Sequence, residues 1–105
     1  MNNHQIQQLL KDSGYYAGDI DGDVGPKTRE AVRKIIAKNK AKLVNKGQGW
    51  NDNRNLVAAG QLVLAAQGYY KGALDGLAGP QTAKAVDDWS KAQTPVTEFD
   101  KSRLS

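Results

Sequence analysis

Residues 14–32 read GYYAGDIDGDVGPKTREAV, and residues 68–86 read GYYKGALDGLAGPQTAKAV. The two stretches lie 54 positions apart and are identical at 11 of 19 positions without a gap, in the pattern GYYxGxxDGxxGPxTxxAV. Self-similarity at a fixed period is typical of chains that are built from repeated structural units. The sequence therefore predicts two copies of one unit, and the structure of that unit decides the fold.

Each copy begins with a predicted helix that ends at a glycine. In the first copy Ile6, Leu9 and Leu10 have the i, i+3, i+4 spacing of a helix with one apolar face. Gly14 follows at the position where a left-handed glycine closes a helix. The second copy has a capping residue, an apolar stripe and a closing glycine in the same order: Asn51 or Asp52, then Leu56, Ala59, Val63, Leu64 and Gly68.

A second helix follows each loop and begins at a Gly-Pro pair. Proline suits the first helical turn because the N–H group that it lacks has no partner within the helix. The residues that we expect these helices to bury are apolar and helically spaced: Ala31, Val32, Ile35, Ile36 and Leu43 in the first copy, and Ala85, Val86 and Trp89 in the second. We expect the first of these helices to continue through the Lys- and Ala-rich stretch that follows it.

The loop between the two helices of each copy carries specific turn signals. Residues 21–22 and 75–76 are Asp-Gly dipeptides, in which the aspartate accepts backbone N–H groups and the glycine takes a positive φ. We expect one tyrosine of each Tyr-Tyr pair to be a core residue that fixes the loop. Thr28 and Thr82 lie where a hydroxyl group can cap the following helix.

These signals predict an all-α fold, a compact helical bundle of two helix–loop–helix repeats. The first repeat spans residues 1–44, a linker spans residues 45–52, and the second repeat spans residues 53–93. Residues 94–105 form a tail or linker, and both repeats belong to one compact domain. Trp50 is expected to anchor the end of the linker.

The composition excludes several classes of function. The chain has no cysteine, which excludes disulfide scaffolds, cysteine-ligated zinc and thiol nucleophiles. The single histidine, His4, excludes a Ser-His-Asp triad elsewhere in the chain and a multi-histidine metal site. A membrane span needs about 20 consecutive apolar residues, and the sequence has no such run. The N-terminal residues lack the basic and apolar regions of a secretory signal.

The net charge of +4 is concentrated in one stretch of the first copy. This stretch contains one acid, Glu30, and eight basic residues: Lys27, Arg29, Arg33, Lys34, Lys38, Lys40, Lys42 and Lys46. Such a run attracts polyanions or forms a solvated helix face. An alternative function is therefore a basic helical module that binds nucleic acid or a host protein. The stretch has no aromatic interleaving and no basic counterpart in the second copy, so nucleic acid is the less favoured partner.

The repeated motif resembles the peptidoglycan-binding domain (PGBD-like) family of bacteria and phages, here as two tandem degenerate repeats. The residues that carry the resemblance in the first copy are Ile6, Gln7, Leu9, Leu10, Gly14, Tyr15, Gly18, Asp21, Gly22, Gly25, Pro26, Thr28, Ala31 and Val32. In the second copy they are Gln61, Leu64, Gly68, Tyr69, Gly72, Asp75, Gly76, Gly79, Pro80, Thr82, Ala85, Val86 and Trp89. Ile35-Ile36 replaces the Phe-Gln of the family, and a second turn of the family unit is missing from both copies.

The resemblance implies a non-catalytic module that binds bacterial cell-wall peptidoglycan, both glycan strand and stem peptide. It also implies that the module targets a phage endolysin or another cell-wall hydrolase whose catalytic domain is not in this chain. No cofactor is expected, and the chain is expected to be a monomer. With no secretory signal, the protein would stay in the host cytoplasm until holin-dependent release to the cell wall.

The candidate binding residues are the tyrosines and the polar residues of the two loops and of the helix starts that follow them. Aromatic rings pack on the C–H faces of sugars. Carboxylates, hydroxyls and amides pair with N-acetyl and peptide groups, and basic residues attract stem-peptide carboxylates. The predicted peptidoglycan-binding residues are Tyr15, Tyr16, Asp19, Asp21, Thr28, Arg29, Tyr69, Tyr70, Lys71, Asp75, Gln81 and Thr82.

Two other kinds of site are weaker interpretations of the same residues. Asp19, Asp21, Asp23 and Glu30 have the spacing of a calcium loop, but Val24 stands where that loop needs glycine. The second copy has no equivalent acids, so we expect no metal site. A glycosidase needs two carboxylates on either side of a cleft, and most acids of this chain lie in predicted turns. We therefore expect no catalytic residue.

Overall fold

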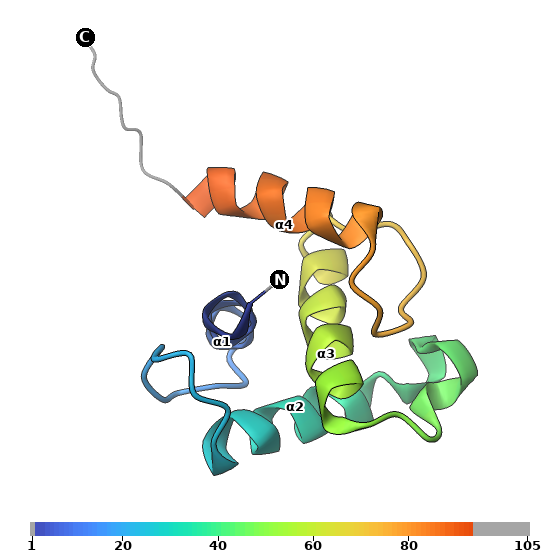
Figure 1. The fold of residues 1–105 in the computed structure, drawn as a ribbon, viewed down its shortest axis with the longest axis horizontal. Coiled ribbons are helices and arrows are strands. Elements are labelled where there is room, and N and C mark those ends of the chain that lie inside the picture. Colours follow the sequence, from blue (N-terminus) through green and yellow to red (C-terminus); the bar gives the residue numbers. More distant parts are fainter. Residues whose placement is uncertain (1, 94–105) are drawn as a thin grey trace, which may run out of the picture.

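The computed structural model describes residues 2–93, and all of the regular secondary structure in that range is helical (Figure 1). Four α-helices and two short 3-10 helices make up the described chain: α1 (Asn3–Asp12), α2 (Pro26–Lys38), η1 (Lys40–Lys42), η2 (Val44–Gly47), α3 (Asp52–Ala66) and α4 (Pro80–Gln93). The predicted all-α fold is confirmed. The predicted tail, residues 94–105, lies outside the described residues.

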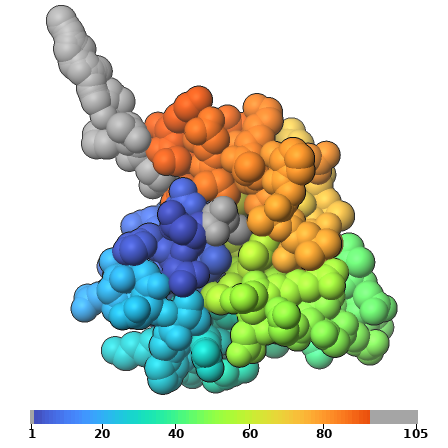
Figure 2. Space-filling view, in the orientation of Figure 1, coloured from blue at the N-terminus to red at the C-terminus, as the bar shows by residue number. Residues whose placement is uncertain are grey.

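Helix α3 is the centre of the fold. It contacts α1, α2 and α4, and Figure 1 shows it standing between α2 and α4. A surface helix buries one stripe of residues, whereas α3 buries every residue from Ala58 to Leu64 as well as Leu56. In the space-filling view the two repeats adjoin along this helix (Figure 2). The core of the molecule is therefore shared by both repeats.

The ends of α1 and α3 follow from local capping chemistry. Asn2 and Gln5 form a capping box, in which each side chain accepts a hydrogen bond of 2.9 Å from the backbone N–H of the other residue. Asn51 caps α3 by accepting the N–H of Arg54 at 2.9 Å, so the cap is Asn51 and not Asp52. Both helices end before a glycine with positive φ, +85° at Gly14 and +88° at position 68. The predicted glycine endings are confirmed.

Helix α2 begins at the predicted proline, but it leaves Ile36 only half-buried and ends before Leu43. Pro26 is its first residue, and Ala31, Val32 and Ile35 are buried. The helix stops at Lys38, so the expectation that it continues through the Lys- and Ala-rich stretch is wrong. The side chain of Asn39 donates a hydrogen bond of 2.8 Å to the carbonyl of Ile35 and occupies an acceptor at the helix end.

The segment between α2 and α3 folds against the second loop. Leu43 is buried between η1 and η2, and the next residue, Val44, donates its N–H to the carbonyl of Leu74 at 3.0 Å. Trp50 packs partly buried against the core, as expected of an anchor, and the guanidinium of Arg54 lies 4.5 Å from the centre of its ring. The Arg54 Nε also donates to the carbonyl of Asp75 at 2.8 Å. The second loop is therefore held by this segment at Leu74 and by α3 at Asp75.

We expect truncation of a buried side chain in the central helix to reduce stability far more than truncation of an exposed side chain in a loop. Leu64 in α3 is fully buried, whereas Leu77 in the second loop is 55% exposed. Leu64→Ala should lower the free energy of unfolding by about 2–5 kcal/mol because it leaves a cavity in the shared core. Leu77→Ala is the control and should change it by less than about 0.5 kcal/mol. Urea unfolding followed by far-UV circular dichroism measures both, and equal losses would contradict the central place of α3.

Candidate functional site

A buried glutamine anchors the first loop. The side chain of Gln7, on α1, is fully buried. Its Nε2 lies 2.8 Å from the carbonyl of Asp23, 3.2 Å from Asp21 Oδ1 and 3.2 Å from Thr28 Oγ1, while its Oε1 accepts the N–H of Gly22 at 2.9 Å. An amide nitrogen has two protons, so three acceptors surround two donors. One side chain thus connects α1 to the turn of the loop and to the start of α2.

The same arrangement recurs 54 residues later. Gln61, on α3, is fully buried. Its Nε2 lies 3.3 Å from Asp75 Oδ1, 3.1 Å from the carbonyl of Leu77 and 3.0 Å from Thr82 Oγ1, and its Oε1 accepts the N–H of Gly76 at 2.9 Å. Both loops are therefore held on their helices by equivalent hydrogen bonds from an equivalent residue.

The two glutamines were matched to the family pattern in the sequence, but no role was predicted for them. They could have been found as polar residues that stand on the apolar face of a helix in both copies. Gln7 lies three residues before Leu10, and Gln61 lies three residues before Leu64. A buried amide must find hydrogen-bond partners, and the polar loop that follows each helix is the nearest source of them.

One tyrosine of each pair is a core residue, as predicted, and it is the second. Tyr16 and Tyr70 are buried, and their hydroxyl groups donate to the carbonyls of Asp19, at 2.7 Å, and Ala73. The first tyrosine of each pair, at positions 15 and 69, is only partly buried against the core. The outer tyrosine rings are therefore the ones with surface to offer a ligand.

Thr28 does not cap α2, and that prediction is wrong. The N-cap residue is Gly25, which makes no side-chain capping bond. Thr28 is instead buried, and its hydroxyl oxygen accepts from Gln7. Thr82 is buried in the same way and accepts from Gln61. The glutamine competes for the threonine hydroxyl because its own amide must be satisfied within the core.

The aspartates form turns as predicted. Asp21 Oδ1 accepts the N–H of Asp23 at 2.9 Å, and Asp75 Oδ1 accepts the N–H of Leu77 at 3.0 Å. The following glycines, at positions 22 and 76, have φ values of +81° and +70°. The N–H of Asp23 and then the amide of Gln7 lower the pKa of Asp21 below its ordinary value of 3.8, because they stabilise the carboxylate.

Seven of the twelve predicted binding residues line two separate hollows, which do not form one groove, and Tyr70, Asp75 and Thr82 line neither. Figure 1 shows the two loops on different sides of α3. The first-loop pocket, of about 430 Å³, is lined by Tyr16, Gly18, Asp19, Asp21, Asp23, Gly25, Pro26, Lys27 and Thr28. The second-loop pocket, of about 260 Å³, is lined by Tyr69, Lys71, Gly72, Gln81, Lys84, Ala85 and Asp88. The ring of Tyr15 lines neither pocket, and Lys38 Nζ lies 5.7 Å from its centre.

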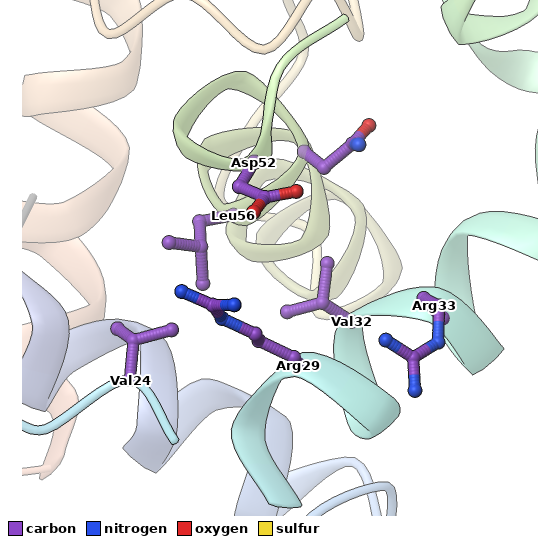
Figure 3. Close-up of a pocket in the computed structure, with 7 residues that line it drawn as sticks. Val24, Arg29, Val32, Arg33, Asp52 and Leu56 are labelled. Carbon is purple, nitrogen blue, oxygen red and sulfur yellow. The ribbon is translucent and has the colours of Figure 1, made fainter. Parts of the chain in front are cut away.

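A third hollow lies between α2 and the start of α3 (Figure 3). This inter-repeat pocket measures about 220 Å³ and is lined by Val24, Arg29, Val32, Arg33, Asp52, Asn55 and Leu56. Of these residues only Arg29 was predicted as a binding residue. In Figure 3 its guanidinium group extends between Val24 and Leu56, below Asp52. The other lining residues could not be grouped from the sequence, because α2 and α3 belong to different repeats.

The basic stretch of α2 and the turns after it lies on the surface. All eight of its basic residues are exposed. One of them, Lys34, pairs with Glu30 at 3.6 Å, and both side chains are more than half exposed. In the range 2–93, no helix is long and apolar enough to cross a membrane. No three histidine, aspartate or glutamate side chains in the same range gather closely enough to hold a metal ion.

Removing the amide of either glutamine should destabilise the loop that it holds. Gln7→Met and Gln61→Met keep the length of the side chain but leave the glycine N–H and the loop carbonyl without their partner. We expect each change to lower the free energy of unfolding by about 1–3 kcal/mol. Gln8→Met is the matched control, because Gln8 bonds an exposed carboxylate on its own helix. Urea unfolding measures all three, and equal effects of Gln7→Met and Gln8→Met would contradict the anchoring role.

The lowered pKa of Asp21 predicts how stability depends on pH. A carboxyl whose pKa is lower in the folded chain stabilises the fold above its ordinary pKa and loses that contribution as pH falls through the folded value. We expect the free energy of unfolding to decrease below about pH 4, and Asp21→Asn to remove part of this decrease. Asp19→Asn, an exposed acid of the same loop, is the control. Unchanged pH dependence in Asp21→Asn, measured by urea unfolding across this range, would contradict the prediction.

The comparison with protein families agrees with this geometry in the first repeat. Residues 3–35 match the family described as Putative peptidoglycan binding domain. The match covers α1, the glutamine-anchored loop and most of α2, about a third of the chain. Searches of curated proteins and of solved structures returned no match. Residues 3–35, with the glutamine-anchored loop that lies within them, are therefore similar to the peptidoglycan-binding domain family.

Proposed function

We propose that this chain binds bacterial peptidoglycan without cleaving it, through both loops. The observation that carries the proposal is the glutamine-anchored loop, which lies within the family match in the first repeat and recurs in the second. Such a loop has little freedom to lose on binding, because the glutamine already fixes its turn. A pre-ordered surface loses less conformational entropy on binding than a mobile one, so more of the interaction energy contributes to affinity.

The second-loop pocket supports contact with an N-acetylated sugar. The partly buried ring of Tyr69 offers an apolar face on which sugar C–H groups can pack. Gln81 supplies an amide that can both donate to and accept from an N-acetyl group, and Lys71 supplies a positive charge beside it. A Cβ atom at Gly72 would lie 2.1 Å from Gln81 Oε1, so the glycine leaves room for that side chain across the loop.

The first-loop pocket has a different chemistry. Three aspartates and Lys27 surround it, and the N-terminus of α2 forms one side. Carboxylates accept hydrogen bonds from sugar hydroxyls and amide N–H groups, whereas Lys27 can donate to a carbonyl or carboxylate. The pocket therefore suits the polar edge of a glycan or of a stem peptide.

We assign no catalytic residue within the described chain. Glu30 is exposed and pairs with Lys34, and Asp21 and Asp75 are engaged in turns. Two weak contacts on one polymer gain strength through effective concentration, so two binding loops are useful to a protein that binds the polymer without cleaving it. We propose that the chain targets a cell-wall hydrolase, such as a phage endolysin released through a holin, and acts as a monomer.

Loop variants should release the protein from purified peptidoglycan sacculi in co-sedimentation. Each loop is changed at two exposed residues, by Asp19→Ala with Lys27→Ala in the first and Lys71→Ala with Gln81→Ala in the second. We expect each pair to reduce the bound fraction. Either pair should weaken binding by roughly 100-fold or more, because the remaining loop then binds without the gain from a second contact on the same polymer. All four changes together should weaken binding further. All four side chains are exposed, and the second loop already carries alanine at the position equivalent to Asp19, so the fold should tolerate the changes.

The control carries Gln67→Ala and Lys91→Ala, two exposed residues that line neither loop pocket. It should sediment with sacculi as the unchanged protein does. Failure of the unchanged protein to sediment at low salt would overturn the proposal. A salt-sensitive gel shift with nucleic acid, in a protein that ignores sacculi, would favour the basic face of α2 as the functional surface instead.

A further inference from the structure

We propose that the inter-repeat pocket binds the free carboxylate end of a peptidoglycan stem peptide. This inference rests on the proposed function and adds to it a third contact, formed between the two repeats. The pocket takes its walls from α2 and from the first turn of α3, so neither repeat could form it alone. Its central group is the guanidinium of Arg29, which points toward the start of α3 (Figure 3).

The two arginines of the pocket are available to a ligand. Arg29 and Arg33 lie one helical turn apart on α2, and both are exposed. Within residues 2–93, neither guanidinium lies within 4.0 Å of a carboxylate oxygen, whereas Lys34 on the same helix pairs with Glu30. A guanidinium binds a carboxylate through two parallel hydrogen bonds, and it stays charged at every physiological pH. An anionic group is therefore the complement of this wall.

The rest of the pocket strengthens and orients that interaction. Val24, Val32 and Leu56 form apolar walls around the Arg29 side chain. They offer an apolar surface on which the methyl groups of a small ligand can pack beside the exposed guanidinium. On the α3 side, Asp52 and Asn55 offer acceptors for an amine or amide N–H. A ligand with a carboxylate and an amino group a few bonds apart can pair with the arginine on the α2 side and with the acceptors on the α3 side.

The size of the pocket limits what it can hold. Sites for drug-sized ligands occupy roughly 300–1,000 Å³, and this pocket has about 220 Å³. By itself it therefore suits one or two small amino acids. A stem peptide ends in small residues with a free carboxylate, which fits this volume and this charge.

The pocket is continuous with the first loop. A further hollow is lined by Val24, Gly25, Pro26, Arg29 and Arg33, so it shares both arginines with the inter-repeat pocket. It shares Gly25 and Pro26 with the first-loop pocket. A peptide whose end lies at Arg29 can therefore extend toward the loop where a glycan is proposed to bind.

The second repeat lacks the two arginines. Positions 83 and 87, which correspond to Arg29 and Arg33 at a shift of 54, hold alanine and aspartate. Asp87 pairs with Lys91 at 3.0 Å on its own helix. The carboxylate site is therefore assigned to the first repeat and α3 alone.

The dipeptide D-Ala-D-Ala tests the inference, because it carries one amine and one carboxylate. Titration into the 15N-labelled full chain should shift the side-chain signals of Arg29 and Asn55. The C-terminal amide of the dipeptide should bind about tenfold more weakly or worse, because it lacks the charge that pairs with guanidinium. Arg29→Gln with Arg33→Gln should abolish this preference, and Lys34→Gln, which removes one charge from the same helix, should leave it unchanged.

The amine is tested separately. N-acetyl-D-Ala-D-Ala should bind more weakly than the free dipeptide to the unchanged protein, and Asp52→Asn should remove that difference. Equal affinity for the dipeptide and its amide, or retained preference in the double arginine variant, would overturn the inference. Sedimentation with sacculi, run in parallel, separates the two proposals. Retention on sacculi without carboxylate preference removes only this pocket, whereas dipeptide binding without retention on sacculi removes only the proposed function.

Discussion

The buried side-chain amide of one glutamine per repeat is the interaction on which the surface of this protein depends. Each loop carries backbone N–H and carbonyl groups that no helix or sheet can pair, and such groups must find partners where water is excluded. Gln7 and Gln61 supply a donor and an acceptor from inside the helix bundle. Because one amide contacts the turn and the next helix together, the position of the loop follows from the packing of the helix that carries the glutamine.

Local rules predicted the helices well and the polar interior poorly. The apolar stripe of α1, the glycine at its end and the proline at the start of α2 depend on neighbours within a few residues, so the sequence displays them directly. The role of Gln7 depends on partners 14 to 21 residues away. The end of α2 at Lys38 combines a local contact with a distant one. Asn39 bonds the carbonyl of Ile35, and burial of Leu43 near the second loop competes with the helix propensity of the Lys- and Ala-rich stretch.

The same distinction applies to the candidate site. The sequence could name the tyrosines, the loop acids and Arg29, because each lies in a motif. It could not say that the second tyrosine of each pair is internal, since the two tyrosines are adjacent and chemically identical. It also could not assemble the inter-repeat pocket, because Asp52 and Asn55 reach Arg29 only through the packing of α2 on α3. Sites within a repeat can therefore be predicted from the sequence, whereas the site between the repeats can be identified only once the fold is known.

The comparison of the two copies separates scaffold from surface. The eight positions at which residues 14–32 and 68–86 differ are exposed or half-buried in both copies, and the positions that are buried in both copies are identical. Packing in the interior therefore explains why the buried positions hold the same residue in both copies. The positions that differ lie where a ligand can reach them. The acids at positions 19 and 23 of the first copy correspond to alanine and leucine at positions 73 and 77 of the second. We infer that the two loops do not bind one ligand twice. A polymer made of glycan and peptide offers each of them a different partner.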